Sequence, residues 1–183
     1  MKYITKKLHC SNPLLKSFKT EIDELTAVLS EQIWNPEYTV KKENKVLNHQ
    51  TAYNKSFSMA FEKIGWQTQP RLSDSPRLIG DFSKGLLFGE IQFGNSSTLY
   101  RDFYKFQYGL QNGLLSLAVL IVPNDEYKFF PTRPASVNNM ANYRLALRYF
   151  TVLPISVPTI IYGLLADTEN VSDEMLNQGI LNG

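Results

Sequence analysis

The chain has 183 residues, of which 43% are hydrophobic and 20% are charged, which predicts one folded domain with a large core and excludes a disordered chain. The net charge of +2 excludes a protein that binds nucleic acid by bulk charge, although a local basic cleft stays compatible with it. No apolar run is long enough to cross a bilayer, and Met1–Leu8 lacks the apolar segment of a signal peptide. The single cysteine, Cys10, excludes an internal disulfide, so we expect a cytoplasmic protein without a membrane partner.

The first third of the chain is predicted to form two helices joined by a polar loop. Asn12-Pro13 is typical of a helix start, and apolar residues then recur at spacings of three and four up to Asn35-Pro36. Residues 37–48 are polar and rich in lysine, which favours a loop. A second helix is predicted from about Thr51 to Gly65, where the glycine ends it.

Residues 86–122 are predicted to form a strand, a helix and a second strand. Leu86–Phe93 is strongly apolar, Gly94–Ser97 supplies a turn, and a helix is expected from about Thr98 to Gln111. Leu114–Val122 is a continuous apolar run that predicts a buried strand. Because a helix connects the two strands, we expect them to be parallel.

The remaining elements complete an α/β fold. They are an irregular segment or short edge strand over 71–80, a loop over 124–134, a helix over 138–150, a third apolar strand over 157–166 and a loosely held polar tail. We expect one domain over residues 1–183, divided into N-terminal helices (1–65), a catalytic core (66–167) and the tail (168–183).

Asp81 and the segment Glu90-Ile91-Gln92 carry the pattern with chemical content. Side chains alternate along a strand, so Glu90 and Gln92 are predicted to share one face and Ile91 the other. Two carboxylates and the Ile91 carbonyl are ligands that suit Mg²⁺, and such a cation activates water and offsets charge on a phosphate. On spacing alone, the end of a surface strand explains this pattern better than a metal site does.

The order and spacing of several motifs add to this pattern. The motifs are Asp81-Phe82, Glu90-Ile91-Gln92-Phe93, Gly94-Asn95-x-Ser97, Gly109-Leu110-x-x-Gly113, the Leu117–Pro123 strand and Val157-Pro158…Gly163-Leu164. In this order the sequence resembles Type II restriction endonucleases of the BglII, BstYI and BamHI group over roughly residues 65–167. The resemblance implies a PD-(D/E)xK nuclease with a restriction-endonuclease-like core, in which helices flank a central mixed sheet.

The resemblance also implies an activity and its residues. It implies Mg²⁺-dependent hydrolysis of both strands of double-stranded DNA at a short palindrome, with GATC-related sites as candidates, by a homodimer paired with a prokaryotic methyltransferase. Asp81 and Glu90 would bind the metal, and Gln92 would stand where most of the superfamily has lysine. A neutral amide orients the nucleophile only through hydrogen bonds. A fourth residue is expected upstream of Asp81, near Gln67 or Gln69.

Five polar residues are candidates for DNA contact. Arg133 falls near a base-reading segment of the family, and arginine is well shaped to bind guanine with two hydrogen bonds. Ser136, Asn138 and Asn139 follow at a predicted helix start, and Asn95 follows the catalytic strand. Capping explains Asn95 and Ser136 equally well, and an exposed loop charge is the alternative for Arg133.

Tyrosines and phenylalanines cover more of the 98–111 helix than one core face needs, which favours a second buried face in a dimer over exposed tyrosines on a monomer. The leading interpretation is therefore a Type II restriction endonuclease. The alternatives are another nuclease of the same fold for repair or junction resolution, a DNA-binding protein that does not cleave, and an α/β interaction protein.

Overall fold

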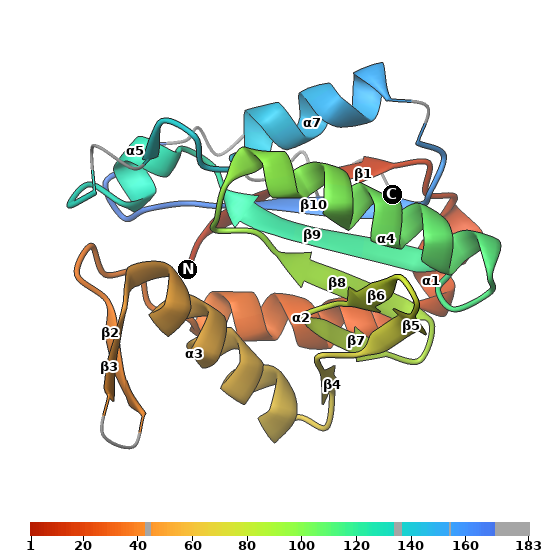
Figure 1. Cartoon of the computed structure of the whole chain (residues 1–183), viewed down its shortest axis with the longest axis horizontal. Helices are drawn as coiled ribbons and strands as arrows, with labels where there is room; N and C mark the ends of the chain where they lie inside the picture. The colour runs from red at the N-terminus through yellow and green to blue at the C-terminus, as the bar shows by residue number, and fades with distance from the viewer. Residues whose placement is uncertain (43–44, 134–136, 154, 171–183) are drawn as a thin grey trace.

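A six-stranded sheet lies between two layers of helices in the computed structural model, which describes residues 1–42, 45–133, 137–153 and 155–170 (Figure 1). The sheet has the strand order β1-β10-β9-β8-β7-β4. Its strands are β1 (Tyr3–Leu8), β4 (Gln67–Thr68), β7 (Phe82–Lys84), β8 (Leu87–Ile91), β9 (Leu117–Pro123) and β10 (Thr159–Leu164). The helices are α1 (Asn12–Ser17), α2 (Lys19–Glu31), α3 (His49–Lys63), α4 (Leu99–Gln111), α5 (Glu126–Phe129) and α7 (Tyr143–Val152), with a 3₁₀ turn η1 (Ser96–Thr98) before α4.

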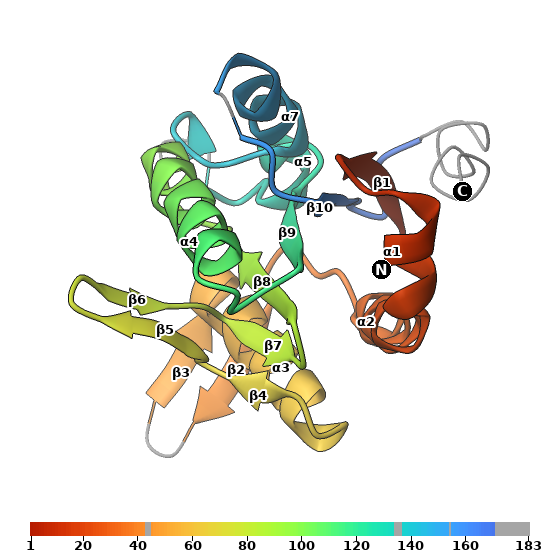
Figure 2. The same cartoon turned by 90° about the vertical axis from the view of Figure 1, so that its right-hand side faces the viewer.

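The central strand β9 shows how the sheet separates two cores. All seven of its residues are buried, and successive side chains point to opposite faces. Leu117, Val119 and Ile121 pack with residues of α2 and α3, whereas Ala118, Leu120 and Val122 pack with residues of α4 and α7. Figure 2 shows α4 on one side of the sheet and α1 and α2 on the other.

The predicted strand–helix–strand unit is confirmed. Strands β8 and β9 are parallel, and β10 adds to β9 in parallel as well. Strands β1 and β7 pair with the parallel core in the antiparallel sense. The sheet is therefore mixed, as expected. None of the helices in the described part of the chain is long and apolar enough to cross a membrane.

The prediction of two helices joined by a loop within residues 1–65 is right for the helical regions and wrong for the segments around them. Residues 3–8 form strand β1, which pairs with β10 at the far end of the sequence. The lysine-rich segment predicted as a loop forms a hairpin of β2 (Thr39–Lys42) and β3 (Lys45–Asn48). The single predicted first helix is two helices, because Phe18 has φ −105° and ψ 16° and its N–H bonds the carbonyls of Leu14 and Lys16.

Other boundaries also differ from the prediction. Residues 71–79 form a hairpin of β5 (Arg71–Asp74) and β6 (Arg77–Ile79), and α5 lies within the predicted loop after β9. The helix predicted from Asn138 begins at Tyr143, because the side chain of Asn142 caps it by accepting from the N–H of Leu145. The polar tail begins as an ordered segment, since Glu169 accepts hydrogen bonds from the Ala166 N–H and the Asn124 side chain. Residues 171–183 lie outside the described part of the chain.

Candidate active site

The β7–β8 hairpin brings Asp81 beside the end of β8. Phe82 pairs with Gly89, and the N–H of Asp81 donates to the Gly89 carbonyl at 3.1 Å. The Asp81 carboxylate then accepts from the Ile91 N–H at 2.7 Å. Nine positions of sequence are thus folded back, so that Asp81 lies next to the Glu90-Ile91 peptide.

Two glycine–phenylalanine pairs hold this hairpin in register. A Cβ on Gly89 would lie 2.1 Å from the Phe82 ring, and a Cβ on Gly80 would lie 2.2 Å from the Phe88 ring. Each ring therefore covers the partner's glycine at a spacing that no other residue allows. We call Gly80, Phe82, Phe88 and Gly89 the glycine–phenyl interlock.

Helix α4 packs on one face of the sheet and places Asp102 and Lys105 beside the end of β8. The Lys105 ammonium donates to Glu90 Oε1 at 2.7 Å and to Asp102 Oδ1 at 3.2 Å. The Gln92 side chain donates to Asp102 Oδ2 at 2.9 Å and accepts from the Gly94 N–H at 2.9 Å. Glu90 and Gln92 therefore share the α4 face, as predicted, while Ile91 and Phe93 pack in the core with α2 and α3.

Burial and crowding of carboxyl groups shift the ionisation of this site. Burial raises the pKa of Glu90 well above its ordinary value of 4.5, and repulsion from Asp81 and Asp102 adds to the effect. Burial also raises the pKa of Asp81, against the opposing hydrogen bond from the Ile91 N–H. Burial alone would lower the pKa of Lys105, but attraction from Glu90 and Asp102 outweighs it and the pKa is raised.

The donor set fits a hard divalent cation. Asp81 and Glu90 are adjacent carboxyl groups whose ionisation is disfavoured by burial and mutual repulsion, and a cation between them would relieve both effects. Oxygen ligands are those that Mg²⁺ prefers. Among the described residues, no group of three or more His, Cys, Asp or Glu is arranged to hold a metal ion. A cation here would therefore take its remaining ligands from backbone carbonyls, water or substrate.

A cavity of about 540 Å³ opens beside Asp81 and Ile91. Its opposite wall is one face of α3, at helical spacing: Thr51, Asn54, Lys55 and Ser58. Gln69 also lines this cavity, and its N–H donates to the Asp81 carbonyl at 3.1 Å. One further residue was expected near Gln67 or Gln69; both are exposed, but Gln69 lies next to Asp81, whereas Gln67 pairs with Ser83 in the sheet.

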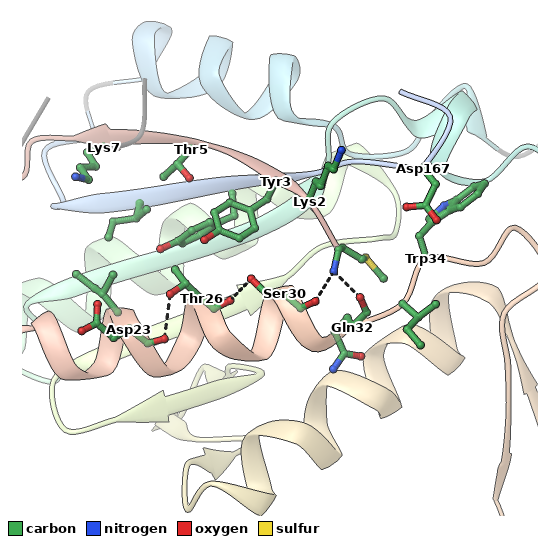
Figure 3. A pocket seen from close by; sticks show the side chains of 15 residues that line it. Lys2, Tyr3, Thr5, Lys7, Asp23, Thr26, Ser30, Gln32, Trp34 and Asp167 are labelled. Carbon is green, nitrogen blue, oxygen red and sulfur yellow. Dashed lines mark hydrogen bonds between the residues drawn. The ribbon is translucent and has the colours of Figure 1, made fainter. Parts of the chain in front are cut away.

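A larger cavity, of about 840 Å³, lies between β1, β10 and α2 (Figure 3). Lys2, Tyr3 and Asp167 line it, and Tyr3 points toward Thr26 and Ser30 of α2 in the close-up. The N-terminal ammonium donates to the carbonyls of Leu29 and Ser30 at 2.9 and 3.0 Å. This cavity shares no lining residue with the one beside Asp81, so its size alone does not make it the reaction site.

The predicted DNA-contacting residues are partly brought together. Asn95 pairs with Met140 in an isolated bridge, and the N–H of Ser96 donates to the Asn139 carbonyl at 2.6 Å. Asn95, Asn138 and Asn139 are exposed. Asn95 also caps its turn by accepting from the Ser97 N–H, and Asn138 accepts from the Tyr127 hydroxyl. Arg133 is partly buried, and Ser136 lies outside the described residues.

Sequence reasoning missed Asp102 and Lys105. A signal was present, because Asp102 falls on the apolar face of its helix between Leu99 and Phe106, at spacings of three and four. A charged residue in that position requires a buried partner.

Known proteins resemble this chain over nearly its whole described length. A family model described as restriction endonuclease BglII/BglIII matches residues 3–164, which include Asp81, Glu90 and the strands from β1 to β10. A search of curated proteins finds no match. The fold is similar to the crystal structure of restriction endonuclease BglII complexed with a DNA 16-mer, with a TM-score of 0.73 and 16% sequence identity over 93% of this chain and 79% of that chain.

Proposed function

The chain belongs to the BglII/BglIII family of restriction endonucleases and is a Type II site-specific deoxyribonuclease; from this premise we propose that it cuts double-stranded DNA by Mg²⁺-dependent hydrolysis at a short palindromic site. The observation that carries the metal requirement is the pair of adjacent carboxyl groups, of which Asp81 borders an open polar cavity and Glu90 is buried beside it. We place the enzyme in the prokaryotic cytoplasm with a cognate methyltransferase, and treat residues 1–183 as one nuclease domain. A GATC-related site is the first to test.

The catalytic residues of the proposal are Asp81, Glu90 and Gln92. Asp81, Glu90 and the Ile91 carbonyl would hold Mg²⁺, which supplies Lewis acidity and lowers the pKa of water. Asp81 is oriented by its hydrogen bond from the Ile91 N–H, and Glu90 by Lys105. Gln92 is an amide fixed at both ends, by Asp102 and by the Gly94 N–H, and it would orient the attacking water through hydrogen bonding.

The substrate backbone is proposed to enter the cavity between Asp81 and α3. Lys55 provides a positive charge there, next to the carboxylate of Glu62 in the same wall, and Asn54 and Ser58 provide polar groups that would contact phosphate oxygens. The scissile phosphate would lie next to Asp81 and Gln69. This arrangement places phosphate contacts on one helix and the carboxylates on the hairpin opposite.

Base recognition is proposed for Asn95, Arg133, Ser136, Asn138 and Asn139. Support comes from Asn95 and Asn139, which belong to adjacent backbone segments beyond the catalytic strand and are both exposed. Their short amide side chains suit contact with base edges, whereas arginine suits guanine.

The proposed homodimer uses the outer face of α4. Tyr100 and Tyr104 are 51% and 50% exposed, while Phe103 and Phe106 of the same helix are buried. Exposed aromatic residues of this kind are enriched at the centres of protein interfaces. Sedimentation velocity should give a dimer that Tyr104→Glu dissociates, and a monomer at micromolar concentration would contradict the dimer.

The deciding experiment incubates the protein with plasmid DNA, with and without Mg²⁺, and sequences the ends of the fragments. We expect discrete fragments that end at one short palindrome. Glu90→Ala should abolish cleavage and leave DNA binding intact, with Glu21→Ala, a partly buried α2 carboxylate, as control. No discrete fragments with any divalent metal would remove the proposed activity, and cuts without a shared palindrome would favour a repair or junction nuclease.

A further inference from the structure

Lys105 is buried, with 5% of its surface exposed, although lysine is rarely buried unless it is paired. It belongs to α4 rather than to the strand that carries Glu90 and Gln92. Burying its ammonium requires desolvation, which only close partners offset. Those partners are Glu90 at 2.7 Å and Asp102 at 3.2 Å.

The contacts of Lys105 reach both polar residues at the end of β8. Glu90 is contacted directly. Gln92 is contacted through Asp102, whose second carboxylate oxygen accepts from the Gln92 amide. The strand itself offers a neutral side chain at position 92, so the fixed positive charge next to Glu90 comes from the helix behind it.

We propose that Lys105 is a positioning residue of the active site, which holds the Glu90 carboxylate directly and the Gln92 amide through Asp102, and so sets the rate of cleavage. This inference rests on the proposed function of the site. An ammonium beside Glu90 repels a second cation, so it does not improve metal affinity. Its contribution is orientation, since a carboxylate and an amide that are already held need no rearrangement during the reaction.

A purely structural role for Lys105 predicts different measurements. If Lys105 only neutralised buried carboxyl groups, its loss would lower folding stability, and a refolded or stabilised variant would cleave normally. If Lys105 positions Glu90 and Gln92, a folded variant cleaves slowly even when Mg²⁺ saturates. Cation affinity separates a loss of positioning from a disrupted metal site, because loss of the ammonium alone leaves the affinity unchanged or raises it, whereas a disrupted site binds the cation more weakly.

The test compares Lys105→Met with Lys19→Met, which removes a lysine from an exposed ion pair with Asp23 on α2. Single-turnover cleavage is measured at saturating Mg²⁺, Ca²⁺ binding by calorimetry without DNA, and folding by thermal unfolding. We expect the Lys105→Met rate to fall at least about 100-fold with unchanged or tighter Ca²⁺ binding. Wild-type cleavage by folded Lys105→Met, or full recovery at higher Mg²⁺, would overturn the proposal.

A second variant covers the case in which Lys105→Met does not fold. Lys105→Met/Asp102→Asn removes the ammonium together with one of its two carboxylates, while the asparagine oxygen still accepts from Gln92. We expect a folded and slow enzyme, and a wild-type rate would show that Lys105 only neutralised Asp102. If neither methionine variant folds, Lys105→Arg decides, because the wider guanidinium should displace Glu90 and slow cleavage without weakening Ca²⁺ binding. A wild-type rate for Lys105→Arg would then overturn the proposal.

The proposed function and this inference fail in distinguishable ways. Wild-type protein that cuts no DNA with any divalent metal removes both. Wild-type cleavage that Glu90→Ala abolishes, combined with full activity of a folded Lys105→Met variant, removes the inference alone.

Discussion

The polar groups on the two sides of β8 differ in their exposure to solvent. On the α4 side, Glu90, Asp102 and Lys105 are at most 5% exposed, and both carboxylates bond the Lys105 ammonium. On the α3 side, Asp81 borders a cavity of about 540 Å³ with a polar wall that includes Lys55. One strand end is thus closed on one side and open on the other.

This difference assigns one task to each side of β8: one side fixes catalytic side chains in position, and the other gives a cation and substrate access to the site. Buried polar groups are costly unless every partner is present, and a satisfied network becomes rigid. The closed side can therefore hold Glu90 and Gln92, while the open side leaves Asp81 accessible to a cation and to a phosphate. The two sides should therefore respond differently to substitution, to pH and to salt.

The closed side should tolerate substitution poorly. Asp102→Ala leaves Lys105 with one partner and Gln92 without its acceptor, so we expect a loss of about 3–5 kcal/mol in the free energy of unfolding. Asp23→Ala, which breaks an exposed ion pair with Lys19, should cost about 0–1 kcal/mol. Urea denaturation measures both, and equal losses would show that the buried network is no more sensitive to the loss of a carboxylate than an exposed ion pair is.

The pH should change how strongly a cation stabilises the protein. Carboxyls whose pKa is raised on folding favour the folded state at low pH, and this contribution is lost as the pH rises through the folded pKa. A bound cation reverses the loss, by about 2.7 kcal/mol at 100 times its Kd. The rise in Tm caused by Ca²⁺ should therefore grow as the pH is raised. On acidification it should disappear before the pH falls to 4.5, the ordinary pKa of Glu90.

Glu90→Gln serves as the control for this pH dependence. It removes the carboxyl with the strongly raised pKa, so the pH-dependent part of the Ca²⁺ effect should shrink. A Ca²⁺ effect that is independent of pH in the wild-type protein would place the cation elsewhere.

Adding a single methyl group to the β7–β8 hairpin should destabilise the protein. In Gly89→Ala the new Cβ would lie 2.1 Å from the Phe82 ring, which is itself stacked on Phe61 at 4.2 Å between ring centroids. Overpacking of this kind costs about 1–3 kcal/mol. Thermal unfolding should show the loss, and Gly89→Ala/Phe82→Leu should recover part of it. A neutral Gly89→Ala would mean that the ring moves aside freely.

The open side should respond through binding rather than stability. Lys55→Ala removes one cationic group from the cavity wall, so the slope of log K against log salt for DNA binding should fall by about 1. Lys63→Ala, on the same helix but outside the cavity, is the matched control and should leave the slope unchanged. Fluorescence anisotropy with Ca²⁺ in place of Mg²⁺ measures binding without cleavage. Equal slopes for both variants would remove α3 from the substrate path.

The sequence predicted the centre of the fold better than its edges. The β8–α4–β9 unit was predictable because continuous apolar runs mark strands that are buried on both faces. Strand β1 was not, because it mixes lysines with one buried residue, Ile4, and becomes a strand only by pairing with β10. The β2–β3 hairpin was missed for a similar reason, since its lysines are typical of a loop.

The site was predictable where it depends on one strand and not where it depends on packing. Alternation along β8 gave the shared face of Glu90 and Gln92 without knowledge of their partners. Lys105 comes from a helix that crosses that face, so no local spacing connects it with Glu90. Asp102, a charge within an apolar helix face, was the only local sign of the network.

The glycine–phenyl interlock also provides a sequence signature for this site. Along the chain it is nearly a mirror pattern: Gly80-Asp81-Phe82 leads into β7, and Phe88-Gly89-Glu90 lies within β8. The turn between them, at Gly85 and Leu86, is exposed and takes no part in the interlock. The rings and glycines therefore fix the two carboxylates relative to each other, and the turn ties the hairpin to β9, because the Leu86 carbonyl accepts from the N–H groups of Ser116 and Leu117 at 2.8 and 3.3 Å. A search that pairs G-[DE]-F with F-G-E would therefore select relatives by this ring–glycine contact as well as by the two carboxylates.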